Sequence, residues 1–175
     1  MCWSHASLPA ALRCSVLAAL RAGLLLLLAL AGCADPVRDR ASGSRTSARV
    51  TRHTDGDTLW LSEVGKVRLI GVDTPEVFSA VECFGRRAAA FVRRLLPLGT
   101  EVRYRLGAEE RDRYGRALVY VWLGDGRFLN RLLLARGYAR TLTIPPNIEY
   151  ADGFAAAARR ARTRGRGLWA PGACV

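Results

Sequence analysis

Short stretches in which apolar and polar residues alternate begin near residue 48 and predict β-strands. Five such stretches occur, at residues 48–53, 57–63, 66–72, 101–106 and 116–123. Apolar residues at helical spacing predict three helices, at residues 85–97, 128–136 and about 150–164. The Asp-Gly pair within TDGD (residues 54–57) is a tight-turn signal between the first two strands.

One helix follows the third strand and two helices follow the fifth. This order fits an α+β fold, a five-stranded OB-type β-barrel with three α-helices, over residues 48–175. Barrels of this type often bind oligonucleotides, but the fold alone does not define a function.

The third predicted strand carries an arginine inside an apolar run, VRLIGVDTPE (residues 67–76). Alternation places Arg68 on one face with Ile70 and Val72, opposite Val67 and Leu69. A cation on an apolar face is costly unless an anion meets it. We therefore expect Arg68 to pair with a carboxylate or to bind an anionic substrate.

A different pattern occupies the N-terminus, where Arg21 is followed by AGLLLLLALAGC. This apolar run is short for a transmembrane span and is typical of an export signal. The ending LAGC resembles a bacterial lipobox, in which Cys33 is lipidated. We expect a lipoprotein-type signal peptide at residues 1–32, and the lipidated Cys33 with a flexible polar tether at residues 33–47. The alternative is an ordinary signal peptide, with Cys33 incidental.

Charge and cysteines refine this picture. Residues 1–32 contain two of the 27 basic residues and none of the 15 acidic ones, so 25 basic and 15 acidic residues remain, a formal charge of +10. Such a basic domain attracts polyanions. Of the five cysteines, Cys83 and Cys174 lie in the exported domain and form either one disulfide or two free thiols.

Candidate chemistry is concentrated at three strand ends: DGDT at residues 55–58, Arg68 with DTPE at residues 73–76, and DRYGR at residues 112–116. Carboxylates without histidine suit Ca²⁺ or Mg²⁺ rather than zinc. Two arginines suit a phosphate, whose oxygens they hold bidentately. A cation, an arginine pair and a spare carboxylate base together predict a phosphodiester hydrolase.

These three blocks, in this order and spacing, resemble the staphylococcal nuclease (thermonuclease) family over about residues 48–170. The resemblance implies Ca²⁺-dependent hydrolysis of DNA or RNA that leaves 3′-phosphates, with one Ca²⁺ per domain. It implies that Asp57 and Asp73 ligate Ca²⁺ through carboxylates and Thr74 through its carbonyl, with Asp55 in support.

The resemblance also implies roles at the substrate. Arg68 and Arg116 would bind the scissile phosphate, and Glu76 would orient or deprotonate the attacking water. Tyr114 and Arg113 would contact the nucleotide. In the family's type member two tyrosines follow the second helix, and aligning on Gly137 places Thr143 and Pro145 at those positions.

Asp112 is expected to be a loop acid that accepts hydrogen bonds from backbone amides. Two alternatives to the nuclease interpretation remain. Arg68 and Arg116 could be structural ion-pair partners of Asp73 and Glu76. The protein could also be a non-catalytic OB-fold nucleic-acid-binding envelope lipoprotein. The preferred hypothesis is a monomeric nuclease that is tethered to the bacterial cell envelope through a lipid on Cys33. The alternative localisation is periplasmic or secreted.

Overall fold

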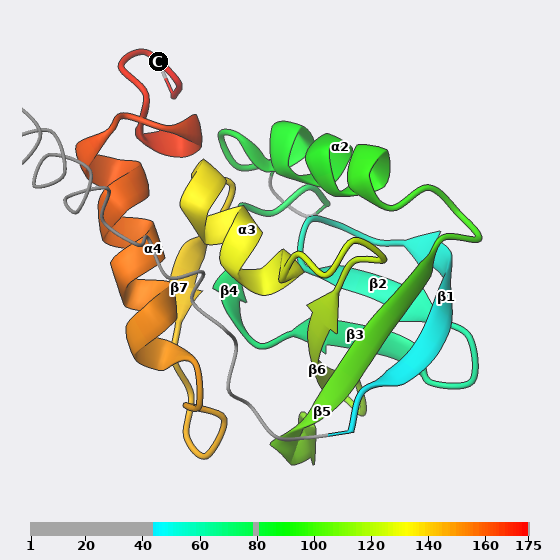
Figure 1. Ribbon diagram of the computed structural model, residues 1–175. Coiled ribbons are helices and arrows are strands. Elements are labelled where there is room, and N and C mark those ends of the chain that lie inside the picture. The colour runs from blue at the N-terminus through cyan, green and yellow to red at the C-terminus, as the bar shows by residue number, and fades with distance from the viewer. Residues whose placement is uncertain (1–43, 79–80, 175) are drawn as a thin grey trace, which may run out of the picture. The chain divides into compact units, whose positions relative to one another are not determined.

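The computed structural model describes residues 44–78 and 81–174 (Figure 1). The expected signal peptide, Cys33 and tether residues 34–43 lie outside the described residues. Among those that are described, no helix is long and apolar enough to cross a membrane.

Five strands close into a barrel in the order β1-β2-β3-β6-β5 (Figure 1). They are β1 Thr46–His53, β2 Thr58–Leu61, β3 Gly65–Leu69, β5 Glu101–Arg111 and β6 Ala117–Trp122. The pair β3–β6 is parallel and the other neighbours are antiparallel. The register sets Arg68 of β3 between Thr58 of β2 and Leu118 of β6. The predicted five-stranded barrel is confirmed, although β1 begins at Thr46, inside the stretch assigned to the tether.

The three predicted helices are present, as α2 Gly85–Leu95, α3 Leu129–Arg136 and α4 Ala151–Thr163, followed by the 3₁₀ turn η2 Gly167–Trp169. Helix α3 packs against both α4 and β6 (Figure 1). Its Asn130 is fully buried and accepts a hydrogen bond from the Val121 amide at 3.0 Å while donating to the Ile70 carbonyl at 2.8 Å. This amide side chain fixes the helix to the barrel where β3 ends.

The expectation of one strand over residues 66–72 is wrong. The chain turns at Ile70, and β4 Gly71–Asp73 leaves the barrel to pair with β7 Arg140–Leu142, a strand the sequence did not predict. Gly71 has φ +78°, and a Cβ there would meet the ring of Phe154. Alternation consequently stops at Leu69, and both Ile70 and Val72 are buried. The break directs Asp73 and the residues after it toward the barrel rim.

A disulfide joins Cys83 to Cys174, with 5.5 Å between their Cα atoms. Of the two alternatives left open for these cysteines, the bridge is the one observed. Cys83 lies two residues before Gly85, the first residue of α2, so the bridge fixes the C-terminal segment beside the start of that helix.

Candidate active site

The first part of the site is the tight turn between β1 and β2. The Asp55 carboxylate accepts hydrogen bonds from the amides of Asp57 at 3.0 Å and Thr58 at 2.7 Å. Burial raises the pKa of Asp55, although the Thr58 amide and the charge of Arg68 oppose that shift. A Cβ on Gly56 would lie 2.8 Å from Cγ2 of Thr74, so glycine lets the two loops approach. Asp55 therefore shapes the turn that presents Asp57.

Asp57 is the buried centre of the site, with 4% of its surface exposed. Its Oδ2 accepts from the Thr74 amide at 2.6 Å and from the Thr74 hydroxyl at 2.9 Å. Its Oδ1 forms an ion pair with Arg68. Asp57 thus joins the β1–β2 turn to the segment that follows β4.

Arg68 projects from β3 with 13% of its side chain exposed, and it also pairs with Asp73 at 2.9 Å. Burial lowers the pKa of the Arg68 guanidinium, which Asp73 opposes. Because arginine stays protonated in proteins, this buried cation depends on anionic neighbours. Pairing with Asp73 was one of the alternatives raised by the sequence, and pairing with Asp57 was not anticipated.

The residues expected to hold a metal are brought together in part. Asp57 and Asp73 both contact the Arg68 guanidinium, so their oxygens converge on one positive group. Within residues 44–78 and 81–174, no group of three or more His, Cys, Asp or Glu side chains surrounds a single point. Two carboxylates and the Thr74 carbonyl are hard oxygen donors of the kind Ca²⁺ takes, and solvent would have to complete its six to eight ligands. The donor set fits Ca²⁺ in chemical type.

The second arginine lies at the tip of the β5–β6 hairpin. Asp112 accepts hydrogen bonds from the amides of Tyr114 at 2.9 Å and Arg116 at 3.0 Å, and from the Arg116 guanidinium at 2.6 Å. Burial alone would raise the pKa of Asp112, but these hydrogen bonds outweigh it and the pKa is lowered. Asp112 is the loop acid that the sequence predicted, and it, rather than Glu76, is the ion-pair partner of Arg116.

Tyr114 is 67% exposed on the same hairpin. Its hydroxyl accepts a hydrogen bond from Arg113 at 2.7 Å, and the guanidinium carbons of Arg113 and Arg116 lie 4.8 and 5.4 Å from its ring centre. The ring therefore presents an exposed aromatic surface flanked by two cations.

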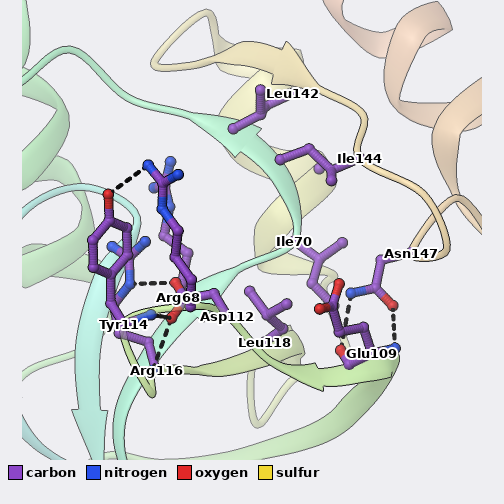
Figure 2. A pocket seen from close by; sticks show the side chains of 12 residues that line it. Arg68, Ile70, Glu109, Asp112, Tyr114, Arg116, Leu118, Leu142, Ile144 and Asn147 are labelled. Atoms are coloured by element: carbon purple, nitrogen blue, oxygen red, sulfur yellow. Dashed lines mark hydrogen bonds and ion pairs between the residues drawn. The ribbon is translucent and has the colours of Figure 1, made fainter.

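A cavity of about 490 Å³ connects Arg68 with the tip of the β5–β6 hairpin (Figure 2), whereas Asp57, Asp73 and Thr74 do not line it. Arg68, Asp112, Arg113, Tyr114 and Arg116 line it together with Gly71 and six residues outside the predicted site: Ile70, Glu109, Leu118, Leu142, Ile144 and Asn147. The segment after α3 thus contributes Leu142 and Ile144, each one position before the residues aligned with the two tyrosines. Neither is aromatic.

Glu76 lies apart from this cavity lining, on the exposed segment between β4 and α2. Its backbone carbonyl accepts from the Glu82 amide at 2.9 Å, and its amide donates to the Glu82 carboxylate at 3.3 Å. A Cβ on Gly85 would meet the Glu76 carbonyl. The segment is therefore held through its backbone, which leaves the Glu76 carboxylate facing solvent.

The structure thus combines a closed five-stranded barrel with one cavity that both Arg68 and Arg116 line. Residues 66–171 match the family described as staphylococcal nuclease homologue. The thermonuclease of Staphylococcus hyicus is 36% identical over 135 residues, which is 74% of this chain and 79% of that protein. The thermonuclease of Staphylococcus intermedius is 39% identical over 126 residues, 69% of this chain and 74% of that protein. Endonuclease YncB of Bacillus subtilis is 34% identical over 126 residues, 67% of this chain and 59% of that protein.

The fold and the relatives define a nuclease, a hydrolase of phosphodiester bonds in nucleic acid. The chain belongs to the staphylococcal nuclease family. The family, the fold class and the enzyme class predicted from the sequence are confirmed.

Proposed function

We propose that the protein is a Ca²⁺-dependent nuclease that cuts DNA or RNA and leaves 3′-phosphates. The observation that supports this most directly is that Arg68 and Arg116 line one cavity, each in contact with a carboxylate. Planar guanidinium groups bind phosphate oxygens bidentately, and two of them on one cavity suit a phosphodiester.

Asp57, Asp73 and the Thr74 carbonyl would hold the Ca²⁺, with Asp55 fixing the turn that carries Asp57. When bound, the cation would supply positive charge to the phosphate oxygens. Arg68 already contacts both carboxylates, so the carboxylates and a phosphate compete for the same guanidinium. A Ca²⁺ ion bound to Asp57 and Asp73 would neutralise their charge, and the Arg68 guanidinium would then be available to the substrate phosphate.

Arg68 and Arg116 would bind the non-bridging oxygens and stabilise the charge that develops on them in the transition state. Glu76 would accept a proton from a water molecule whose oxygen attacks phosphorus. The bond from phosphorus to O5′ then breaks, O5′ takes up a proton, and the phosphate remains on the 3′ side. The solvent-facing position of Glu76, three residues after Asp73, is compatible with that role.

Tyr114 and Arg113 would contact the nucleotide from the hairpin, where the ring offers a stacking surface and the guanidinium a further phosphate contact. We further propose that residues 1–32 direct export, that Cys33 anchors a monomer to the cell envelope through a lipid, and that residues 34–45 form the tether. Incorporation of labelled fatty acid into the protein, lost in Cys33→Ser, would test the anchor.

The enzymatic hypothesis is tested by degradation of single-stranded DNA by the purified protein in Ca²⁺ and in EGTA. We expect cleavage in Ca²⁺, loss of cleavage in EGTA, and loss of most turnover in Glu76→Gln. The products should accept a 5′-phosphate from a kinase without prior phosphatase treatment. Salt-sensitive DNA binding without cleavage in any divalent cation would instead support a non-catalytic binding module, an interpretation that the nuclease-named relatives disfavour.

A further inference from the structure

The cavity has two chemically different ends (Figure 2). Arg68, Arg116 and Tyr114 lie at one end, and Glu109 and Asn147 lie at the other. Aliphatic side chains lie between them: Ile70 and Leu118 from the barrel, and Leu142 and Ile144 from the segment after α3. A nucleotide has the same layout, with a phosphate, a flat apolar body and a polar edge.

The aliphatic residues provide contact surface for a base without aromatic stacking. Leu142 and Ile144 are 40% and 57% exposed, so they have apolar surface left to bury. A volume of about 490 Å³ lies within the range of about 300–1,000 Å³ found for small-molecule sites. Apolar contact of this kind holds a base but does not distinguish one base from another.

Glu109 is an exposed residue at the far end of the cavity, and its backbone is held in place by Asn147. Asn147 accepts from the Glu109 amide at 3.0 Å and donates to its carbonyl at 3.0 Å, which holds the backbone on both sides. A Cβ on Gly107 would meet the Asn147 carboxamide and would lie 2.7 Å from Cδ1 of Ile70. Strand β5 therefore packs tightly against Asn147 and Ile70 just before Glu109. The Glu109 carboxylate takes no part in that pairing and points back over Ile70 toward the interior of the cavity (Figure 2).

We propose that Glu109 selects the base, by accepting hydrogen bonds from amino-bearing base edges. A carboxylate only accepts hydrogen bonds, so it favours edges that donate and is repelled by carbonyl edges. Guanine offers two adjacent donors, N1–H and the exocyclic amino group, and therefore pairs bidentately. Thymine and uracil flank their one N–H with two carbonyls. The inference rests on the proposed function, since it places the scissile phosphate at the arginine end.

The test is calorimetric titration of the protein with deoxyguanosine and thymidine 3′,5′-bisphosphates, and with an abasic deoxyribose 3,5-bisphosphate. We expect the guanosine compound to bind about tenfold more tightly than the thymidine compound, as one good bidentate contact allows. Glu109→Gln and Glu109→Ala should each reduce this ratio to near one. Glu110, the next residue on the strand, is also exposed but does not line the cavity, so Glu110→Gln controls for the loss of one negative charge.

Equal binding of both bases by the unmodified protein, or a preference that survives Glu109→Ala, would overturn the assignment. If all three compounds bind alike and DNA is cleaved, base selection by Glu109 is wrong while the nuclease proposal stands. If none binds and no DNA is cleaved, both proposals fail.

Discussion

The carboxylate of Asp112 holds Arg116 at two points. One oxygen accepts the backbone amide of Arg116 at 3.0 Å, and the other accepts its guanidinium Nε at 2.6 Å. The same carboxylate accepts the Tyr114 amide at 2.9 Å, so one side chain shapes the hairpin tip and aims its arginine. The position of Arg116 on the cavity is thereby set before a ligand arrives, and preorganised donors of this kind are the ones that stabilise transition-state charge.

Asp112→Asn should therefore lower kcat/KM for DNA by about 10- to 100-fold, as expected for a displaced substrate-binding group. The asparagine keeps an oxygen for the backbone amides but loses the charge that holds the guanidinium. The matched control is Asp125, which binds the amide and Nε of Arg127 at the same 3.0 and 2.6 Å in a hairpin away from the cavity. Asp125→Asn should leave kcat/KM unchanged, and equal losses in both variants would contradict a specific role for Asp112.

The lowered pKa of Asp112 predicts a pH-dependent contribution to stability. A carboxyl group whose pKa is lower in the folded state contributes stability above its unfolded pKa, about 3.9, and loses it as pH falls through the folded value. The difference in Tm between the unmodified protein and Asp112→Asn should be constant above about pH 5 and shrink below about pH 4. Asp55, whose pKa is raised, is present in both proteins and cancels in this difference. A gap that widens in acid would contradict the assigned shift.

The two arginines should differ in their effect on stability. Removing Arg68 leaves Asp57, with 5% of its side chain exposed, without its ion-pair partner, and such a loss costs about 3–5 kcal/mol. Removing Arg116 leaves Asp112 with two backbone amides, so we expect a smaller loss of about 1–2 kcal/mol. Urea unfolding in EGTA measures both. Ca²⁺ should restore part of the stability of Arg68→Ala if Asp57 and Asp73 bind the cation, and no gain would argue against that metal site.

The disulfide should contribute to stability because it closes a long loop, with its two cysteines 91 positions apart in sequence. The double variant Cys83→Ser with Cys174→Ser should lower the free energy of unfolding by about 2–4 kcal/mol. Urea unfolding of both proteins, with and without reductant, checks this. Reductant should destabilise the unmodified protein toward the variant and leave the variant unchanged; a variant as stable as the oxidised protein would contradict the prediction.

The predictable part of the site lies in short segments where the local sequence dictates the geometry. The Asp-Gly turn at Asp55 and the DRYGR hairpin built on Asp112 are of this kind, because each acid satisfies amides within four residues of itself. The ion pair between Arg68 and Asp57 depends on how two loops meet, and no local pattern indicates it.

The side of the cavity that Leu142 and Ile144 line could not be predicted either, because it also depends on how distant segments pair. Strand β7 is three exposed residues with no periodicity, and it forms because β4 leaves the barrel at Gly71. The chain leaves α3 at Gly137, which has φ +73° and where a Cβ would meet the backbone carbonyl of Arg166. Leu142 and Ile144 line the cavity, whereas Thr143 and Pro145, the positions that alignment on Gly137 gives for the two tyrosines, do not.

The central claim is that Arg116 and its neighbours bind and activate a phosphodiester in this cavity. The most direct test is the single-turnover rate of cleavage of single-stranded DNA in saturating Ca²⁺ for Arg116→Ala and Arg127→Ala. Both substitutions remove an arginine paired to an aspartate at 2.6 Å, but only Arg116 of the two lines the cavity. We expect Arg116→Ala to slow cleavage by about 10²–10³-fold, the usual cost of removing a donor that stabilises transition-state charge, and Arg127→Ala to leave the rate unchanged. Equal rates in the two variants would contradict the account.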